Sequence, residues 1–356
     1  MTNYINLDDV EVIAPNFKKR LSGVTSTIIQ LVPRQRKLGL NIAVCGAGLP
    51  AELPHVRIRD FWKLWFTTKS GDHRIWHARR NIEMLPAIIM RDLLRMKLKI
   101  VFTSASQRQH KKYTKWLISK MDSVIATSHK TAKYLEVPNT VIMHGIDLER
   151  FSPAKNKQDT KRQLGLDPTK KIAGCFGRIR KQKGTDIFVD TMIEILPQHE
   201  NWIAIIAGRT TAEHIDFEKS LKSKIDNANL ADRILFVGEH TNIENWYQAL
   251  DLFIAPQRWE GFGLTPLEAG ACGVPTIAAD VGAFSEIIIE NKTGAMTPIN
   301  DPERMIELTK FYIEDEALLS KHGKHVRHHM ETEFSLQKEA TAINNTYQET
   351  SDSFKG

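Results

Sequence analysis

Short apolar segments alternate with helical segments through the second half of the chain, and this alternation most limits the possible fold. Five such segments are KIAGCFG (171–177), WIAIIAG (202–208), RILFVGE (233–239), DLFIAPQ (251–257) and PTIAAD (275–280). Strands that are apolar throughout are typical of a parallel sheet covered by helices on both faces. The pattern therefore predicts an α/β fold with a doubly wound, Rossmann-like domain.

The first half shows the same alternation less regularly. Its candidate strands are residues 10–15, 40–46, 73–79, 98–104 and 123–128. The stretch 151–171 is rich in Pro, Lys and Asp and has weak apolar periodicity, which is typical of a joint between domains. We expect Rossmann-like domains at 1–155 and 156–330, and a C-terminal helix within 331–356 that is free to pack back on the first domain.

Charge is divided at the same joint. Residues 1–150 contain 25 Lys and Arg against 12 Asp and Glu, whereas residues 151–356 contain 24 against 30. A basic first domain favours an anionic partner such as nucleic acid, anionic lipid or a phosphorylated substrate; scattered surface charge is the plainer alternative. No apolar run reaches the roughly 20 residues of a membrane span, and the first residues do not resemble a signal peptide, so we expect a cytoplasmic protein.

The most informative local motif is a tight turn between two glutamates. Glu260 and Glu268 flank Gly261 and Gly263, and the letters TPLE that end the motif predict a capping box with Thr265 as N-cap. Capping alone would make Glu268 purely structural. It does not explain the glycines, which let a ligand approach the backbone at the carboxyl edge of the sheet, where such folds bind ligands. Glu260 lies outside the predicted helix, and accepting hydrogen bonds from sugar hydroxyls is its favoured role.

Several segments, in order along the chain, resemble those of the retaining family 4 glycosyltransferases, which have the GT-B fold. They are SGV (22–24), HGID (144–147), GRIRKQKG (177–184), EGFGLTPLE (260–268) and DVGAFSEII (280–288). His144 stands where Asn is usual, and Ala283 stands where Gly is usual. The resemblance spans nearly the whole chain, is stronger in the second domain, and implies two Rossmann-like domains facing a cleft that holds a nucleotide sugar.

The resemblance also implies roles for single residues. Arg178 and Lys183 match the cations that stabilise the departing diphosphate, and Glu268 matches the residue that accepts from the ribose hydroxyls. Arg209 and His240 are expected to frame the nucleotide base. The predicted donor site comprises Gly23, Arg178, Lys183, Arg209, Glu260, Phe262, Gly263, Leu264, Thr265 and Glu268.

We expect neither a cofactor nor a metal. The chain lacks the Asp-x-Asp pair of metal-dependent glycosyltransferases, and the two cations would take over the role of Mg²⁺. The histidine-rich segment 321–330 offers His325, His328 and His329 as ligands, but a polar surface helix is the favoured interpretation.

Retention without an obvious nucleophile implies a front-face displacement, in which the leaving phosphate helps to deprotonate the acceptor. Relatives carry a His where this chain has Ser104; His110 either replaces it or is a helix-surface residue, and His77 is similarly ambiguous. The predicted catalytic residues are Glu260, Arg178, Lys183 and His110, and the predicted acceptor or membrane contacts are Arg108, Lys111, Lys112 and Lys115.

The segment RIRDFWKLWFTTK (57–69) has two interpretations. Helical spacing places Ile58, Phe61, Trp62, Trp65 and Phe66 on one face, flanked by Arg and Lys. Such a face suits either a membrane interface or packing against the first sheet.

Segments of the first domain, among them IWHARRNIEM, are most similar to bacterial lipopolysaccharide core mannosyltransferases. This implies a peripheral protein on the inner face of the cytoplasmic membrane that transfers mannose from GDP-mannose to Kdo, an acidic inner-core sugar on lipid A, with no nucleic-acid partner. Two alternatives stay open. One is another GT-B enzyme using a UDP-sugar, such as a glucosyltransferase or an epimerase; the other is a non-catalytic, membrane-associated nucleotide-sugar-binding protein.

Overall fold

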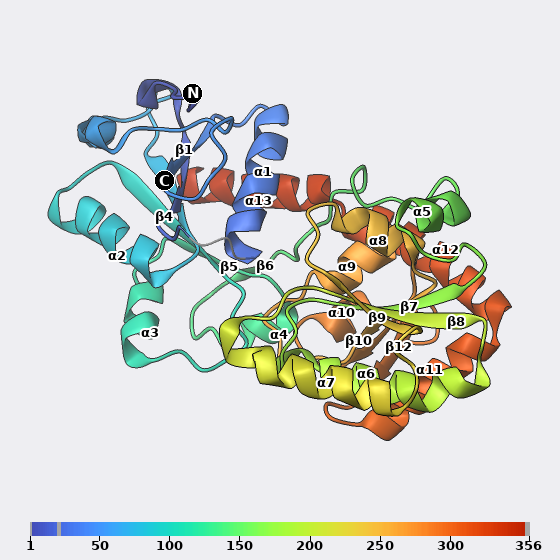
Figure 1. Ribbon diagram of the computed structural model, residues 1–356. Helices are drawn as coiled ribbons and strands as arrows, with labels where there is room; N and C mark the ends of the chain where they lie inside the picture. Colours follow the sequence, from blue (N-terminus) through green and yellow to red (C-terminus); the bar gives the residue numbers. More distant parts are fainter. Residues whose placement is uncertain (1, 20–22, 353–356) are drawn as a thin grey trace. The chain divides into compact units, whose positions relative to one another are not determined.

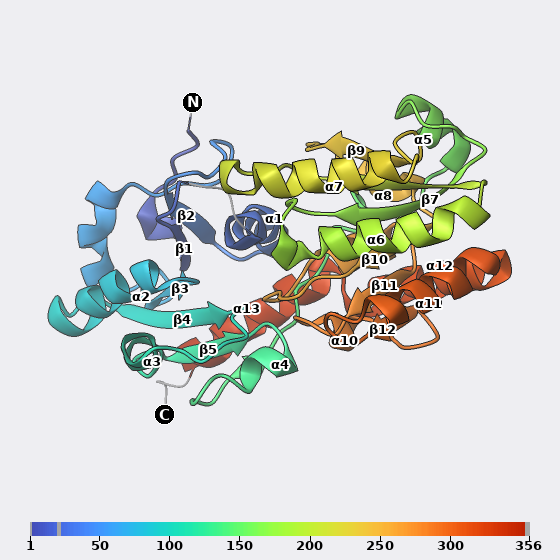
Figure 2. The same ribbon diagram turned by 60° about the horizontal axis from the view of Figure 1, so that its bottom comes forward.

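The computed structural model describes residues 2–19 and 23–352 and divides the chain into two compact units (Figure 1). Unit 1 ends its first part at Gly145 and resumes at Leu336, and unit 2 comprises Ile146–Ser335. Each unit is built on a six-stranded sheet whose paired strands run parallel, which confirms the α/β prediction (Figure 2). The sequence predicts the boundary between the two domains after residue 155, whereas the first part of unit 1 ends at Gly145.

Unit 1 has the strand order β2-β1-β3-β4-β5-β6. Its strands are β1 (Val12–Asn16), β2 (Ile42–Gly46), β3 (Arg74–Ala78), β4 (Leu98–Ser104), β5 (Ser123–Ala126) and β6 (Thr140–Val141). Its α-helices are α1 (Gly23–Lys37), α2 (Asn81–Ile88), α3 (Lys112–Ile118), α4 (His129–Ala132) and α13 (Leu336–Asp352). Two 3₁₀ helices, η1 (Leu7–Asp9) and η2 (Ile58–Trp65), and one π-helical turn, η3 (Ile89–Leu93), complete it.

The sheet of unit 1 is buried on both faces. Residues of α1 and α13, among them Ile28 and Ile343, cover one face, and Leu64 of η2 and Met84 of α2 lie in the core on the other. The C-terminal helix α13 is bound there by polar contacts as well, because Glu339 accepts hydrogen bonds from the Gly145 amide at 2.8 Å and pairs with His144 Nδ1 at 2.7 Å. Residues at both ends of the chain thus contribute to one core.

Unit 2 has the strand order β12-β11-β10-β7-β8-β9. Its strands are β7 (Lys171–Phe176), β8 (Trp202–Ala207), β9 (Ile234–Gly238), β10 (Leu252–Ala255), β11 (Thr276–Ala279) and β12 (Gly294–Thr297). Its α-helices are α5 (Lys157–Gln163), α6 (Thr185–Ile195), α7 (Ile215–Asn227), α8 (Ile243–Ala249), α9 (Thr265–Ala271), α10 (Phe284–Ile287), α11 (Pro302–Glu314) and α12 (Glu316–Glu333). The 3₁₀ helices are η4 (Lys181–Lys183), η5 (Leu196–Gln198) and η6 (Ala212–His214).

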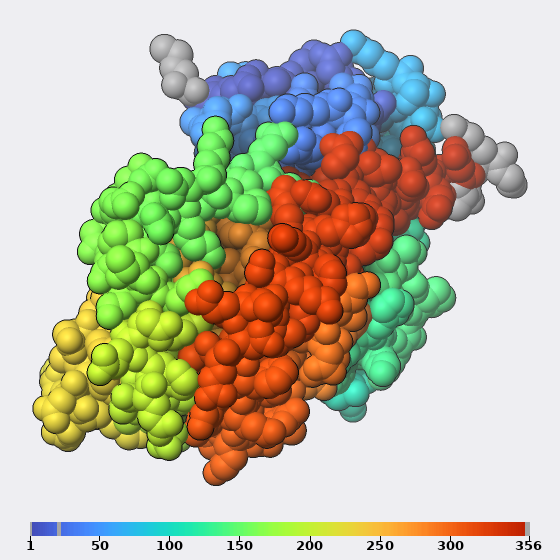
Figure 3. Space-filling view, turned by 90° about the vertical axis from the view of Figure 1, so that its right-hand side faces the viewer, coloured from blue at the N-terminus to red at the C-terminus, as the bar shows by residue number. Residues whose placement is uncertain are grey.

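This strand order creates a topological switch between β7 and β10. From β7 the chain builds outward through β8 and β9, then crosses to β10 on the other side of β7 and continues to β11 and β12. Connections that leave two neighbouring strands in opposite directions open a crevice at the carboxyl ends of those strands. Helices α11 and α12 form much of the surface of this unit away from that edge (Figure 3). The crevice is where a ligand site is expected.

The single helical face predicted for 57–69 is wrong, because the segment forms a 3₁₀ helix and not an α-helix. A 3₁₀ helix has about three residues per turn. The five apolar residues predicted to share one face of an α-helix therefore do not share a face of η2 and the residue that follows it. Phe61 turns inward and contacts Trp76 with ring centroids 5.9 Å apart, whereas Ile58, Trp62, Trp65 and Phe66 are exposed. Within residues 2–19 and 23–352, no helix is long and apolar enough to cross a membrane.

Candidate active site

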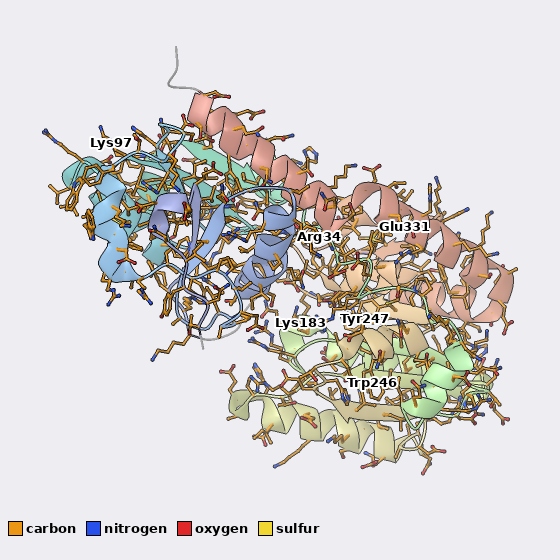
Figure 4. All side chains as sticks on the ribbon, turned by 90° about the horizontal axis from the view of Figure 1, so that it is seen from above. Arg34, Lys97, Lys183, Trp246, Tyr247 and Glu331 are labelled. Atoms are coloured by element: carbon orange, nitrogen blue, oxygen red, sulfur yellow. The ribbon has the colours of Figure 1, made fainter. Side chains whose placement is uncertain are left out.

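Two predicted site residues meet at the switch point of unit 2. The loop after β7 carries Lys183 at the end of η4, and the loop after β10 carries Glu260. The Nζ of Lys183, which is labelled in Figure 4, donates to Glu260 Oε2, and 19% and 20% of the two side chains are exposed. Because β7 and β10 are neighbours in the sheet, residues 77 positions apart in sequence become the two sides of one polar centre.

Two glycines let these loops approach each other. Gly184 has φ +69°, and a Cβ there would lie 1.9 Å from the carbonyl oxygen of Pro256 at the end of β10. Gly263 has φ +88°, and a Cβ there would lie 2.3 Å from the Phe284 ring and 2.9 Å from Glu260 Cγ. Only glycine fits both positions without displacing a neighbour.

An arginine that the sequence analysis did not include joins the same loops. Arg258 donates two hydrogen bonds to Asp186, at 2.7 and 2.9 Å, and its amide donates to Gln182 O at 2.9 Å. Such a bidentate pair fixes geometry as well as charge. Arg258 therefore positions the loop that bears Lys183, and its only local signal was its place just after a predicted strand.

The capping box predicted at Thr265 is not formed. Helix α9 begins at Thr265 with Leu264 as N-cap and no side-chain cap, because Glu268 turns instead to α8, where its Oε2 accepts from the Tyr247 hydroxyl at 2.7 Å. Burial raises the pKa of Glu268, and the hydrogen bond from Tyr247 acts in the opposite direction. The hydroxyl of the buried Tyr247, which is labelled in Figure 4, thus donates to the Glu268 carboxyl group.

We expect Tyr247→Phe to destabilise the protein by about 1.5–3 kcal/mol at neutral pH and by less in acid. The raised pKa means that Glu268 costs stability as pH rises from its unfolded value, about 4.3, through its folded value. Losing the tyrosine hydrogen bond raises that pKa further and enlarges the cost. Urea unfolding at neutral and mildly acidic pH measures this. In a Glu268→Gln background the substitution should lose its pH dependence; a cost independent of pH with Glu268 intact would contradict the assignment.

The other predicted donor residues are spread over the same edge of the unit 2 sheet, apart from Gly23. Arg178 is exposed on the loop after β7, Phe262 is buried, and Gly263, Leu264 and Thr265 are half-buried at the start of α9. Arg209 follows β8 and is exposed, with its Nε 3.5 Å from Glu239; His240 follows β9 and stacks on Trp246, ring centroids 4.5 Å apart. Gly23 is the first residue of α1 in unit 1, and its neighbour Ser22 lies outside the described residues.

The basic residues predicted for the acceptor lie between β4 and the first turns of α3. Arg108, Lys111 and Lys112 are exposed, and Lys115 pairs with Glu136. His110 is on the loop before α3 rather than on a helix surface, and its Nε2 has no hydrogen-bond partner in the part of the chain described. It lines a cavity of about 300 Å³.

Hydrogen bonding separates the two candidate histidines, since burial lowers the pKa of both. Burial, with help from Arg108, lowers the pKa of His110 and favours its neutral form. His77 is fully buried, with its ring nitrogens 2.6 Å from Tyr347 Oη and 2.7 Å from Thr103 Oγ1. Its contacts make His77 part of the unit 1 core, whereas His110 keeps a nitrogen available.

The structure does not gather the histidines of 321–330 into a metal site. In the two described ranges no three His, Cys, Asp or Glu side chains come together in a way that would hold a metal ion. His322 is buried and lies 2.9 Å from the Tyr312 hydroxyl, so this helix is not entirely a polar surface helix.

Comparison with known proteins shows the family of the chain. The profile of the family described as Glycosyl transferases group 1 matches residues 156–329. The lipopolysaccharide core biosynthesis mannosyltransferase LpsB of Rhizobium meliloti (strain 1021) is 58% identical over 97% of this chain and 99% of its own. LpcC of Rhizobium leguminosarum bv. viciae, named for the same activity, is 50% identical over 96% and 97%. A glycosyltransferase structure from Rickettsia africae ESF-5 matches with TM-score 0.81 at 19% identity over 98% of both chains, and the shared fold is GT-B.

Proposed function

The chain belongs to the group 1 glycosyltransferases, with lipopolysaccharide core mannosyltransferases as near relatives, and from this premise we propose that it transfers mannose from GDP-mannose to Kdo of a lipid-linked inner core. It is a glycosyltransferase of lipopolysaccharide core synthesis. The donor, the acceptor and action on the inner face of the cytoplasmic membrane are the proposed part.

The observation that carries the proposal is the Lys183–Glu260 pair at the switch point of unit 2. A lysine held there by a carboxylate and by a glycine-permitted loop is preorganised to meet negative charge, which is what a departing diphosphate develops. Arg178 on the same loop supplies a second cation. We assign to these two cations the role that Mg²⁺ plays in metal-dependent enzymes, so chelators should leave the rate unchanged.

The proposed reaction retains the configuration of the sugar. The bond from the anomeric carbon to the β-phosphate oxygen breaks, the acceptor oxygen bonds to the same face of that carbon, and the acceptor proton passes to the leaving phosphate. Glu260 accepts from sugar hydroxyls, Glu268 accepts from the ribose, and the amides of Gly263 and Leu264 donate to the phosphates or the sugar. His110, kept neutral by burial, is proposed to help orient or deprotonate the acceptor.

Unit 1 is proposed to bind the acceptor because its charge suits an acidic, phosphorylated glycolipid. Residues 1–150 carry 25 Lys and Arg against 12 Asp and Glu, and Arg108, Lys111 and Lys112 are exposed together on one loop and helix start. An excess of cationic side chains attracts anionic partners over distances of about 8–10 Å in salt.

A thermal-shift panel with GDP, UDP, ADP and their sugars tests the donor first. A ligand that binds only the folded state raises the melting temperature by mass action, so GDP and GDP-mannose should raise it and the others should not. Transfer of radiolabelled mannose to Kdo-lipid A, with and without EDTA, then tests the acceptor. A shift with UDP-sugars alone would mean that the donor is a UDP-sugar and not GDP-mannose. No shift with any nucleotide would contradict the proposed donor site.

A further inference from the structure

The surface of unit 1 exposes a group of large apolar side chains that the proposed active site does not use. Two helical segments far apart in sequence, η2 and η3, supply it. The exposed fractions are 65% for Ile58, 54% for Trp62, 46% for Trp65, 62% for Phe66, 74% for Leu93 and 43% for Leu94. These six residues are called the η2/η3 surface below. Apolar groups of this size seldom gather on the surface of a soluble protein without a partner.

Hydrogen bonds between the two segments show that they are continuous. The Trp65 indole Nε1 donates to Leu94 O at 2.7 Å, and the Lys97 amide donates to Leu64 O at 2.7 Å. Trp62 and Phe66 contact edge to face, with ring centroids 6.2 Å apart. The η2/η3 surface is therefore one patch and not two separate ones.

Inward-facing side chains and ion pairs fix η2 to the rest of unit 1. Leu64 is fully buried in the unit 1 core, and Phe61 packs against Trp76 on the same side of the sheet. Lys63 and Lys69 are tied to Asp8 and Asp9 of η1. Since η2 is already anchored by these inward contacts, its outward side chains are not needed for the core.

Cationic side chains surround the patch. Arg57 and Arg59 lie at the start of η2, and Arg95 and Lys97 follow η3; all four are exposed. Lys97 is labelled in Figure 4. The nearby acids are largely matched: Asp60 lies 3.9 Å from Arg59, and Asp92 bonds Arg91. The rim of the patch thus carries net positive charge.

We propose that the η2/η3 surface docks on an anionic lipid bilayer, with Trp62, Trp65 and Phe66 in the headgroup region and the rim cations on lipid phosphates. Tryptophan and phenylalanine beside Arg and Lys are the composition of an interfacial anchor, and each added cation strengthens attraction to anionic lipid. A protein partner would require an acidic surface to meet the same rim. The proposal rests on the proposed function only in that a lipid-linked acceptor brings the enzyme to a membrane.

Vesicle flotation of the full chain tests the proposal without any acceptor. Wild type should float with vesicles of phosphatidylcholine and phosphatidylglycerol and much less with phosphatidylcholine alone. Trp62→Ser with Phe66→Ser should lower the partition coefficient roughly 10- to 100-fold. The matched control is Ile215→Ser with Phe311→Ser, which removes two side chains of unit 2 that are 46% and 54% exposed and should change nothing.

A charge variant tests the rim independently. Arg57→Glu with Lys97→Glu should abolish the preference for phosphatidylglycerol. Wild type that does not float, or an apolar double variant that floats like wild type, would overturn the proposal. So would a wild-type dimer that the same variant converts to a monomer, because the patch would then be an interface between two copies.

Donor binding separates this proposal from the proposed function. The η2/η3 variants should keep the wild-type thermal shift with GDP, since they change only unit 1. Floating protein that shows no nucleotide shift would reject the enzyme assignment and keep the docking surface. A GDP-induced thermal shift in protein that does not float would keep the enzyme assignment and reject the docking surface.

Discussion

Lys183→Ala is expected to lower kcat for sugar transfer by about 100- to 1,000-fold, with little change in KM for the donor. The lysine is held in the crevice by Glu260 before any charge develops, so it needs no reorganisation when the diphosphate leaves. An interaction that strengthens only in the transition state affects kcat, whereas uniform binding affects KM. Initial rates at several donor concentrations separate the two.

Lys181→Ala is the matched control. Lys181 lies two residues earlier on η4 and is exposed, and its side chain forms no ion pair in the part of the chain that the structure describes. Its loss should leave kcat within about twofold of wild type, since surface charges contribute little. Equal loss in both variants would mean that general loop charge matters; wild-type turnover in Lys183→Ala would remove this residue from the site.

Strands were predicted from sequence where they are buried and almost entirely apolar. Strands β7, β8 and β10 have both faces covered, so nearly every position is apolar and the pattern is clear even in the four residues of β10. Strands β6 and β12 were not predicted, because TV has only two residues and GAMT contains only one large apolar side chain. Both lie at sheet edges, where pairing with one neighbour is enough.

The sequence predicted which loops carry the site residues, but it did not predict which of these residues contact each other. Lys183 and Glu260 each follow a predicted strand, which places both at one sheet edge, but the neighbourhood of β7 and β10 depends on strand order. Tyr247 had no signal at all, because the feature that makes it matter, Glu268, lies 21 residues further along on another helix. Local rules predicted capping for Glu268, and a tertiary hydrogen bond replaced it.

The segment 57–66 shows that apolar spacing alone does not predict which side chains are buried. Apolar residues spaced three and four apart fit an α-helix and a 3₁₀ helix over a short stretch, yet the two differ in which residues face inward. The structure turns Phe61 and Leu64 inward and leaves both tryptophans outside. Spacing alone could not choose between a packed face and an exposed one.

Gly184→Ala is expected to be among the most destabilising single substitutions in unit 2, by about 4 kcal/mol or more. The left-handed φ of +69° alone costs an L-residue about 1–2 kcal/mol. The added Cβ would also lie 1.9 Å from the backbone carbonyl oxygen of Pro256, which cannot move without shifting the end of β10. The clash therefore forces apart the two loops that bring Lys183 to Glu260, so transfer should fall with stability.

Gly165→Ala isolates the clash from the backbone strain. Gly165 has φ +73°, nearly the same as Gly184, but its Cβ would meet no atom within 4 Å. It should cost only the strain, about 1–2 kcal/mol, and leave kcat unchanged. Urea unfolding of both variants measures the difference, which should be about 2 kcal/mol or more. Equal costs would show that the loop after β7 can yield at Pro256, and that the close approach of the two loops is not what holds Lys183 in place.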